Sequence, residues 1–137
     1  MSAGRGVVHS EINRSAAPCR LLQIWVEPQT PGGAPQYEQK AFAISNGWTC
    51  LLDPAGAAGA MAIQRPVRLW RSQPKPGERL ELPLRANLQG WLQVIDGAIT
   101  LDGQPLQRGD GLGFQGAQAQ TIMSTGSNAD LLLFELQ

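Results

Sequence analysis

The chain has 137 residues, of which 42% are hydrophobic and 16% charged, and its formal net charge is zero. This composition is typical of one compact globular domain and excludes a disordered chain. A neutral chain gives no electrostatic basis for binding nucleic acid or an anionic membrane surface. No apolar stretch approaches the roughly 20 residues of a membrane-spanning helix, and no apolar run follows Arg5 as in a secretory signal. We therefore expect a cytoplasmic protein with no nucleic-acid or membrane partner.

Glycine and proline are scattered along the chain (16 Gly and 10 Pro), so they leave room for short strands but not for helices of ordinary length. In chain order, we expect a strand at 20–28, a linker rich in proline and glycine at 28–36, and one helical turn at 37–42. Further strands are expected in the apolar runs at 48–52, 60–64, 67–71, 78–84, 91–95, 98–101, 104–107, 119–124 and 129–136. The chain is predicted to be all-β, closed as a sandwich or a barrel.

Two Asp-Gly pairs separate three of these runs. Asp96-Gly97 lies between WLQVI and AITL, and Asp102-Gly103 lies between AITL and QPLQ. Asp-Gly favours a type I′ hairpin turn, because both central residues of that turn have positive φ. The sequence therefore predicts a three-stranded antiparallel meander over 91–107. The last run, ADLLLFEL, is apolar on both faces, as in a strand enclosed within a fold.

The only histidine, His9, is followed two positions later by Glu11. In a strand both side chains would lie on the same face, and an imidazole with a carboxylate suits several divalent metals. A metal held by protein side chains usually has three or four such ligands. From spacing alone, an exposed polar pair is therefore favoured over a metal site.

The cysteines and arginines give weaker signals. Cys19 and Cys50 are too few for a disulfide scaffold, so we expect both to be reduced and buried. Arg65, Arg68 and Arg71 form the densest basic cluster. For these three, a solvated strand edge is favoured over an anion-binding patch.

Four sequence stretches, MSAGRGVVHSE, LQIWVEP, PQYEQKAF and DPAGAAGAMAI, resemble the pirin family, and in particular the bacterial pirin-like proteins associated with quercetin 2,3-dioxygenase activity. The resemblance implies a bicupin, in which the first of two cupin domains holds one metal, usually iron, through three histidines and one glutamate. His9 and Glu11 match the last two of these ligands. The other two belong to an H-x-H motif that this sequence does not contain, so half of the metal shell is expected to be missing.

The resemblance further implies a cupin-type double-stranded β-helix (jelly-roll barrel) with an N-terminal β-strand extension. We expect remnant strands of an N-terminal cupin at 1–26, a linker at 27–46, and the pirin-type C-terminal cupin domain at 47–137. This predicts a binding or structural module, non-catalytic alone and with no cofactor in this chain alone. The alternative is a metal-dependent quercetinase-type dioxygenase whose divalent metal, most simply iron, is completed by residues outside this chain.

Two partners are expected. A pocket inside the barrel, near Trp91, Leu92 and Phe114, is predicted for a small apolar ligand, although core packing is favoured for the four tryptophans. The N-terminal strands would have unpaired edges, which favour association, so a homodimer through these strands is predicted. A role in binding transcription regulators, as for some pirins, is implied by the resemblance alone.

Overall fold

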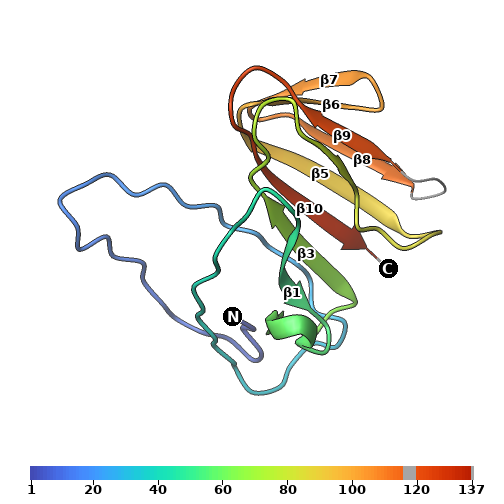
Figure 1. The fold of residues 1–137 in the computed structure, drawn as a ribbon. Helices are drawn as coiled ribbons and strands as arrows, with labels where there is room; N and C mark the ends of the chain where they lie inside the picture. Colours follow the sequence, from blue (N-terminus) through green and yellow to red (C-terminus); the bar gives the residue numbers. More distant parts are fainter. Residues whose placement is uncertain (116–119, 137) are drawn as a thin grey trace.

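The computed structural model describes residues 1–115 and 120–136. Two β-sheets face each other, and a long extended segment precedes them (Figure 1). The described part of the chain contains one helical element, the 3-10 turn η1 (Ala57–Gly59). It contains no helix long and apolar enough to cross a membrane. The expectation of an all-β fold is confirmed.

The larger sheet has six strands in the order β2-β1-β3-β10-β5-β8. Their bounds are β1 (Thr49–Asp53), β2 (Met61–Ala62), β3 (Val67–Ser72), β5 (Gln89–Asp96), β8 (Gly111–Gln115) and β10 (Asp130–Leu136). All neighbours are antiparallel except β1 and β2, which run parallel. The apolar last strand, β10, lies in the interior of this sheet, as its lack of a polar face predicts.

The smaller sheet has four strands in the order β4-β9-β6-β7. Their bounds are β4 (Arg79–Glu81), β6 (Ala98–Leu101), β7 (Gln104–Gln107) and β9 (Thr121–Ser124). The strand predicted at 119–124 is therefore present from Thr121, and Ala119 lies outside the described residues.

The core fills the space between the two sheets. Alternate residues of each strand point inward, so Leu92 of β5 and Leu131 and Leu133 of β10 face Ile99 of β6 and Ile122 of β9. All five side chains are fully or almost fully buried. Burying one such side chain contributes roughly 1.5–3 kcal/mol, so this contact between the sheets contributes strongly to stability.

The two Asp-Gly pairs form different structures. Asp102 (φ 48°) and Gly103 (φ 87°) make the predicted type I′ turn, and β6 and β7 pair on either side of it. Asp96-Gly97 makes no hairpin, because β5 and β6 belong to different sheets. The predicted three-stranded meander is therefore wrong. The apolar faces of β5 and β6 are buried against each other across the core, which side-by-side pairing in one sheet would not allow.

Residues 1–46 form no ladder of strands. Their one bridge joins Ser2 to Gln36, and residues 7–32 make no backbone–backbone hydrogen bond with any residue that the structure describes. The strand predicted at 20–28 and the helical turn predicted at 37–42 are therefore wrong. Residues 20–28 have the composition of a strand but no neighbouring strand to pair with, and composition alone does not satisfy a strand's backbone groups.

Candidate functional site

His9 and Glu11 lie side by side on the extended N-terminal segment. His9 Nε2 is 3.9 Å from a Glu11 carboxylate oxygen, and the side chains are 47% and 50% exposed. Nowhere in residues 1–115 and 120–136 do three or more His, Cys, Asp or Glu side chains gather as metal ligands. Since a metal held by protein usually has three or four such ligands, these two exposed donors do not make a metal site by themselves.

Of the three residues predicted to line an interior pocket, Leu92 and Phe114 face the core and Trp91 does not. Leu92 is fully buried in the core, and Phe114 packs against that core directly over Gly90. Trp91 neighbours Leu92 in the same strand and so points to the opposite face of the sheet. There its ring lies against Gly111 and Gly113, and 43% of the residue is exposed.

A cluster of four charged residues, Asp53, Arg68, Arg85 and Glu135, lies at one end of the space between the sheets. Asp53, Arg68 and Glu135 come from the adjacent strands β1, β3 and β10, respectively. Arg68 donates to both carboxylates, with a distance of 2.9 Å from its Nη1 to Glu135 Oε1. Arg85 donates hydrogen bonds to the Glu135 carboxylate from its backbone N–H (3.0 Å) and from its Nη2 (2.8 Å). Asp53 and Glu135 are almost completely buried, so these partners replace the water that each carboxylate has lost.

The cluster keeps both carboxylates ionised. The Arg68 hydrogen bond, together with the backbone N–H groups of Ala55 and Ala57, lowers the pKa of Asp53. Burial alone would raise the pKa of Glu135, but the hydrogen bonds from Arg85 and Arg68 outweigh burial and leave that pKa lowered. This arrangement suits a structural ion cluster, since a carboxylate held ionised and fully bonded is a poor general acid.

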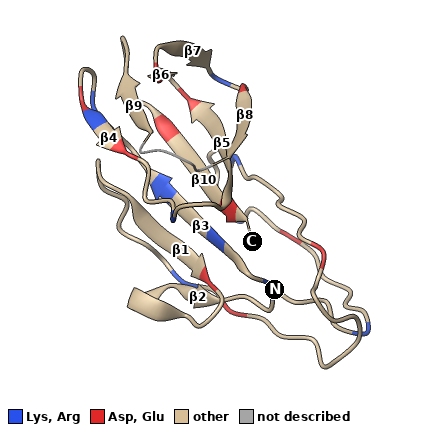
Figure 2. Cartoon of the chain, turned by 90° about the vertical axis from the view of Figure 1, so that its right-hand side faces the viewer, with Lys and Arg blue, Asp and Glu red and all other residues tan. Residues whose placement is uncertain are grey.

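The predicted solvated arginine edge is wrong for two of its members. Arg68 and Arg71 lie on β3, which has a strand on either side (Figure 2). Arg68 pairs with Asp53 and Glu135, and Arg71 pairs with Asp130. Arg71 makes a two-pronged contact with Asp130 of β10, at 2.9 and 2.6 Å. The sequence contained one sign that two separate ion pairs form. Asp130 and Glu135 are an odd number of residues apart, so in a strand their side chains lie on opposite faces of β10.

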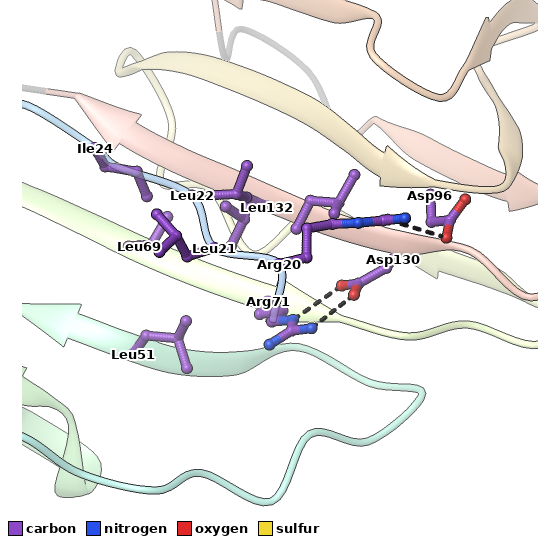
Figure 3. Close-up of a pocket in the computed structure, with 11 residues that line it drawn as sticks. Arg20, Leu21, Leu22, Ile24, Leu51, Leu69, Arg71, Asp96, Asp130 and Leu132 are labelled. Carbon is purple, nitrogen blue, oxygen red and sulfur yellow. Dashed lines mark hydrogen bonds and ion pairs between the residues drawn. The ribbon is translucent and has the colours of Figure 1, made fainter. Parts of the chain in front are cut away.

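A pocket of about 470 Å³ lies between the N-terminal segment and the outer face of the six-stranded sheet (Figure 3). Its wall on the segment side is Arg20, Leu21, Leu22 and Ile24. Its floor on the sheet side is Leu51, Leu69, Arg71, Ile95, Asp96, Asp130 and Leu132. Sequence reasoning missed this pocket, because it assigned residues 20–28 to a strand of another barrel rather than to a cover over this sheet.

Both cysteines are free thiols. Cys50 is half-buried on β1, where burial and the neighbouring Asp53 carboxylate raise its pKa. Cys19 is exposed, so the expectation that both would be buried is wrong for this residue. Neither belongs to a group of three or more metal-ligating side chains among the described residues.

Two small facing sheets of short antiparallel strands, with a filled interior, define a β-sandwich or β-barrel domain of the kind that includes the cupins. The family described as the quercetinase C-terminal cupin domain matches residues 50–136. The chain therefore belongs to the pirin family, through its C-terminal cupin domain, and the cupin fold predicted from the sequence is confirmed.

Relatives support this assignment along nearly the whole chain. The quercetin 2,3-dioxygenase of Escherichia coli K12 is 34% identical over 137 aligned residues, covering 99% of this chain and 59% of that protein. A pirin-like protein of Caulobacter vibrioides is 30% identical, covering 98% of this chain and 60% of its own length. The crystal structure of the bacterial pirin YhhW of E. coli in complex with nickel(II) matches 80% of this chain and 47% of that chain, with 30% identity and a TM-score of 0.73. The chain thus spans about three-fifths of the curated relatives that it matches.

Proposed function

We propose that this chain is a cupin-fold binding or structural module that carries out no metal-dependent chemistry by itself. The observation that carries the proposal is the filled interior. Leu92, Val94, Leu131 and Leu133 are completely buried where a catalytic cupin would need an open cavity. A metal-dependent oxygenase also needs three or four well-placed donors. His9 and Glu11 offer two, on an exposed segment well outside the core.

A second proposal concerns the same pair. His9 and Glu11 would supply two ligands of a divalent metal, most simply iron, with the remaining ligands coming from residues outside this chain. Two observations favour it: the side chains already lie within 3.9 Å of each other and half-exposed, and relatives at 30% identity or more include a quercetin 2,3-dioxygenase and a nickel-bound pirin. A bound metal would supply a Lewis acid for a flavonol substrate and dioxygen. This chain's part would be to present one imidazole and one carboxylate.

One experiment separates the two proposals. The purified chain is incubated with Fe(II) or Ni(II), desalted, analysed for metal by mass spectrometry, and assayed for loss of quercetin absorbance. The module proposal expects far less than one metal per chain and no quercetin loss. One tightly held metal per chain, lost in His9→Ala but kept in the neighbouring control Ser10→Ala, would overturn it. Metal binding that appears only when a second polypeptide supplies the missing ligands would support the shared site.

We also propose that residues 20–26 pair with the same segment of a second copy. Leu21 and Leu22 are about half exposed, Trp25 is 91% exposed, and no described residue makes a backbone–backbone hydrogen bond with this segment. An extended apolar segment with unpaired N–H and C=O groups is a template for strand addition. Two identical segments can pair antiparallel about a two-fold axis, which closes the assembly at a dimer.

A further inference from the structure

We propose that the pocket under the N-terminal segment binds a small amphipathic carboxylate, with Arg20 as its anchor. The pocket volume of about 470 Å³ lies within the roughly 300–1,000 Å³ of small-molecule sites. Seven of its eleven lining residues are leucine or isoleucine. Leu69 and Leu132, which form the middle of its floor, are nearly inaccessible to water. The proposal is independent of whether His9 and Glu11 bind a metal.

Polarity is divided along the pocket. In Figure 3 the side chains of Arg20, Arg71, Asp96 and Asp130 gather at one end, and the leucines and Ile24 occupy the rest. A ligand that fits this division has an apolar body and one polar head. A fully apolar ligand would leave the charged end unused, and a fully polar one would bury polar groups against the leucines without hydrogen-bond partners there.

The sign of the head group follows from which charges are already paired. Arg71 and Asp130 hold each other through two hydrogen bonds, and Asp130 also accepts one from Gln73. This pairing raises the pKa of Arg71. The Arg71 charge is already balanced by Asp130, and a carboxylate head placed beside Arg71 would also meet the Asp130 charge.

Arg20 is different. Its Nη1 lies 3.6 Å from an Asp96 carboxylate oxygen, with 61% of the Arg20 side chain and 56% of the Asp96 side chain exposed. The Arg20 guanidinium donates no hydrogen bond to any residue in the described part of the chain. An exposed ion pair of this kind contributes little, whereas a carboxylate can accept two parallel hydrogen bonds from one guanidinium. If Arg20 moves to a ligand, Asp96 keeps the hydrogen bond from the Gly97 backbone N–H. Arg20 is therefore the anchor with unused donors, and the head group is a carboxylate.

The test uses the full chain and three probes with the same alkyl tail: octanoate, octanol and octylamine. Binding is measured by isothermal titration calorimetry, with circular dichroism confirming that each variant is folded. Octanoate is expected to bind most tightly. Arg20→Gln should weaken octanoate binding about tenfold or more, because a charge-assisted pair of hydrogen bonds is lost. Arg14→Gln, a matched change on the same exposed segment but outside the pocket, should have no effect.

A second variant distinguishes an anchor from a structural role. Asp96→Asn removes the carboxylate that competes for Arg20 and keeps an acceptor for the Gly97 N–H, so it should tighten octanoate binding several-fold. If Arg20 only held the segment onto the sheet, Asp96→Asn would loosen the pocket and weaken binding. The proposal is overturned if the folded chain binds no octanoate, if octanol or octylamine binds as tightly, or if Arg20→Gln behaves like Arg14→Gln.

Discussion

Arg68 of β3 and Glu135 of β10 are direct cross-strand neighbours, and Nη1 of the arginine lies 2.9 Å from Oε1 of the glutamate. The same carboxylate accepts hydrogen bonds from the backbone and the guanidinium of Arg85, in the connection between β4 and β5. Glu135 is only 1% exposed. One buried side chain therefore joins two strands of the larger sheet to the connection that leads from the smaller sheet.

Replacing Glu135 with alanine should destabilise the fold strongly. The substitution leaves Arg68 and Arg85 without their shared acceptor, and removing one partner of a buried ion pair costs about 3–5 kcal/mol. Because both arginines keep some access to water, we expect a loss of stability at the lower end of this range, about 3 kcal/mol. Urea denaturation measures this free energy of unfolding. Glu81→Ala, at an exposed position of β4, is the control and should change it by about 0.5 kcal/mol or less. Equal effects of the two substitutions would contradict a structural role for the cluster.

The same cluster predicts that stability falls in acid. The pKa values of Asp53 and Glu135 are lowered in the folded protein, from ordinary values of 3.8 and 4.5. The unfolded state therefore binds protons first as the pH falls. The contribution of the cluster should be complete above the ordinary values and should be lost as the pH falls below them, through the lowered folded values. Urea midpoints measured from pH 7 down to strong acid test this. Glu135→Gln should flatten the profile, and an unchanged profile in that variant would argue against the assignment.

The two Asp-Gly turns should respond differently to the same substitution. At Gly103 (φ 87°) an added methyl group meets nothing within 4 Å, so Gly103→Ala carries only backbone strain, about 1–2 kcal/mol. At Gly97 (φ 77°) the methyl group would lie 2.5 Å from the Asn128 carbonyl oxygen and 2.8 Å from Ala129 Cα. Gly97→Ala should therefore lower the melting temperature clearly more than Gly103→Ala does. Equal shifts would mean that the chain moves freely where it crosses between the sheets.

Local sequence patterns predicted the features of the fold that depend on residues close together in the chain, such as strands and tight turns. Alternating apolar residues and a type I′ turn at Asp102-Gly103 identified most strands of residues 48–136 and the β6–β7 hairpin. The same reasoning failed at Asp96-Gly97, because a turn signal does not state whether the flanking strands pair or pass to opposite sheets. That outcome is decided by how the apolar faces of β5 and β6 bury each other, which is a tertiary effect.

The candidate site shows the same limit. Spacing predicted that His9 and Glu11 would lie together, and they do, but it could not supply ligands that are absent from the sequence. The pocket depends on Arg20 and Leu22 lying over Leu69 and Leu132, which are distant in the sequence. The composition of a segment such as residues 20–28 does not show whether it pairs as a strand or covers a sheet without pairing.

The exposed segment at 20–26 leads to a final prediction. If it pairs with a second copy, the purified chain should be a dimer by size-exclusion chromatography with light scattering, and the dimer should dissociate on dilution. Trp25→Lys should shift the equilibrium to monomer, because it places a charge in the middle of an apolar pairing segment, where natural sheet edges use lysine to block association. Tyr37→Lys removes another largely exposed aromatic residue outside this segment and should leave the dimer intact. A chain that stays monomeric at high concentration, or two variants that weaken the dimer equally, would show that association does not use residues 20–26.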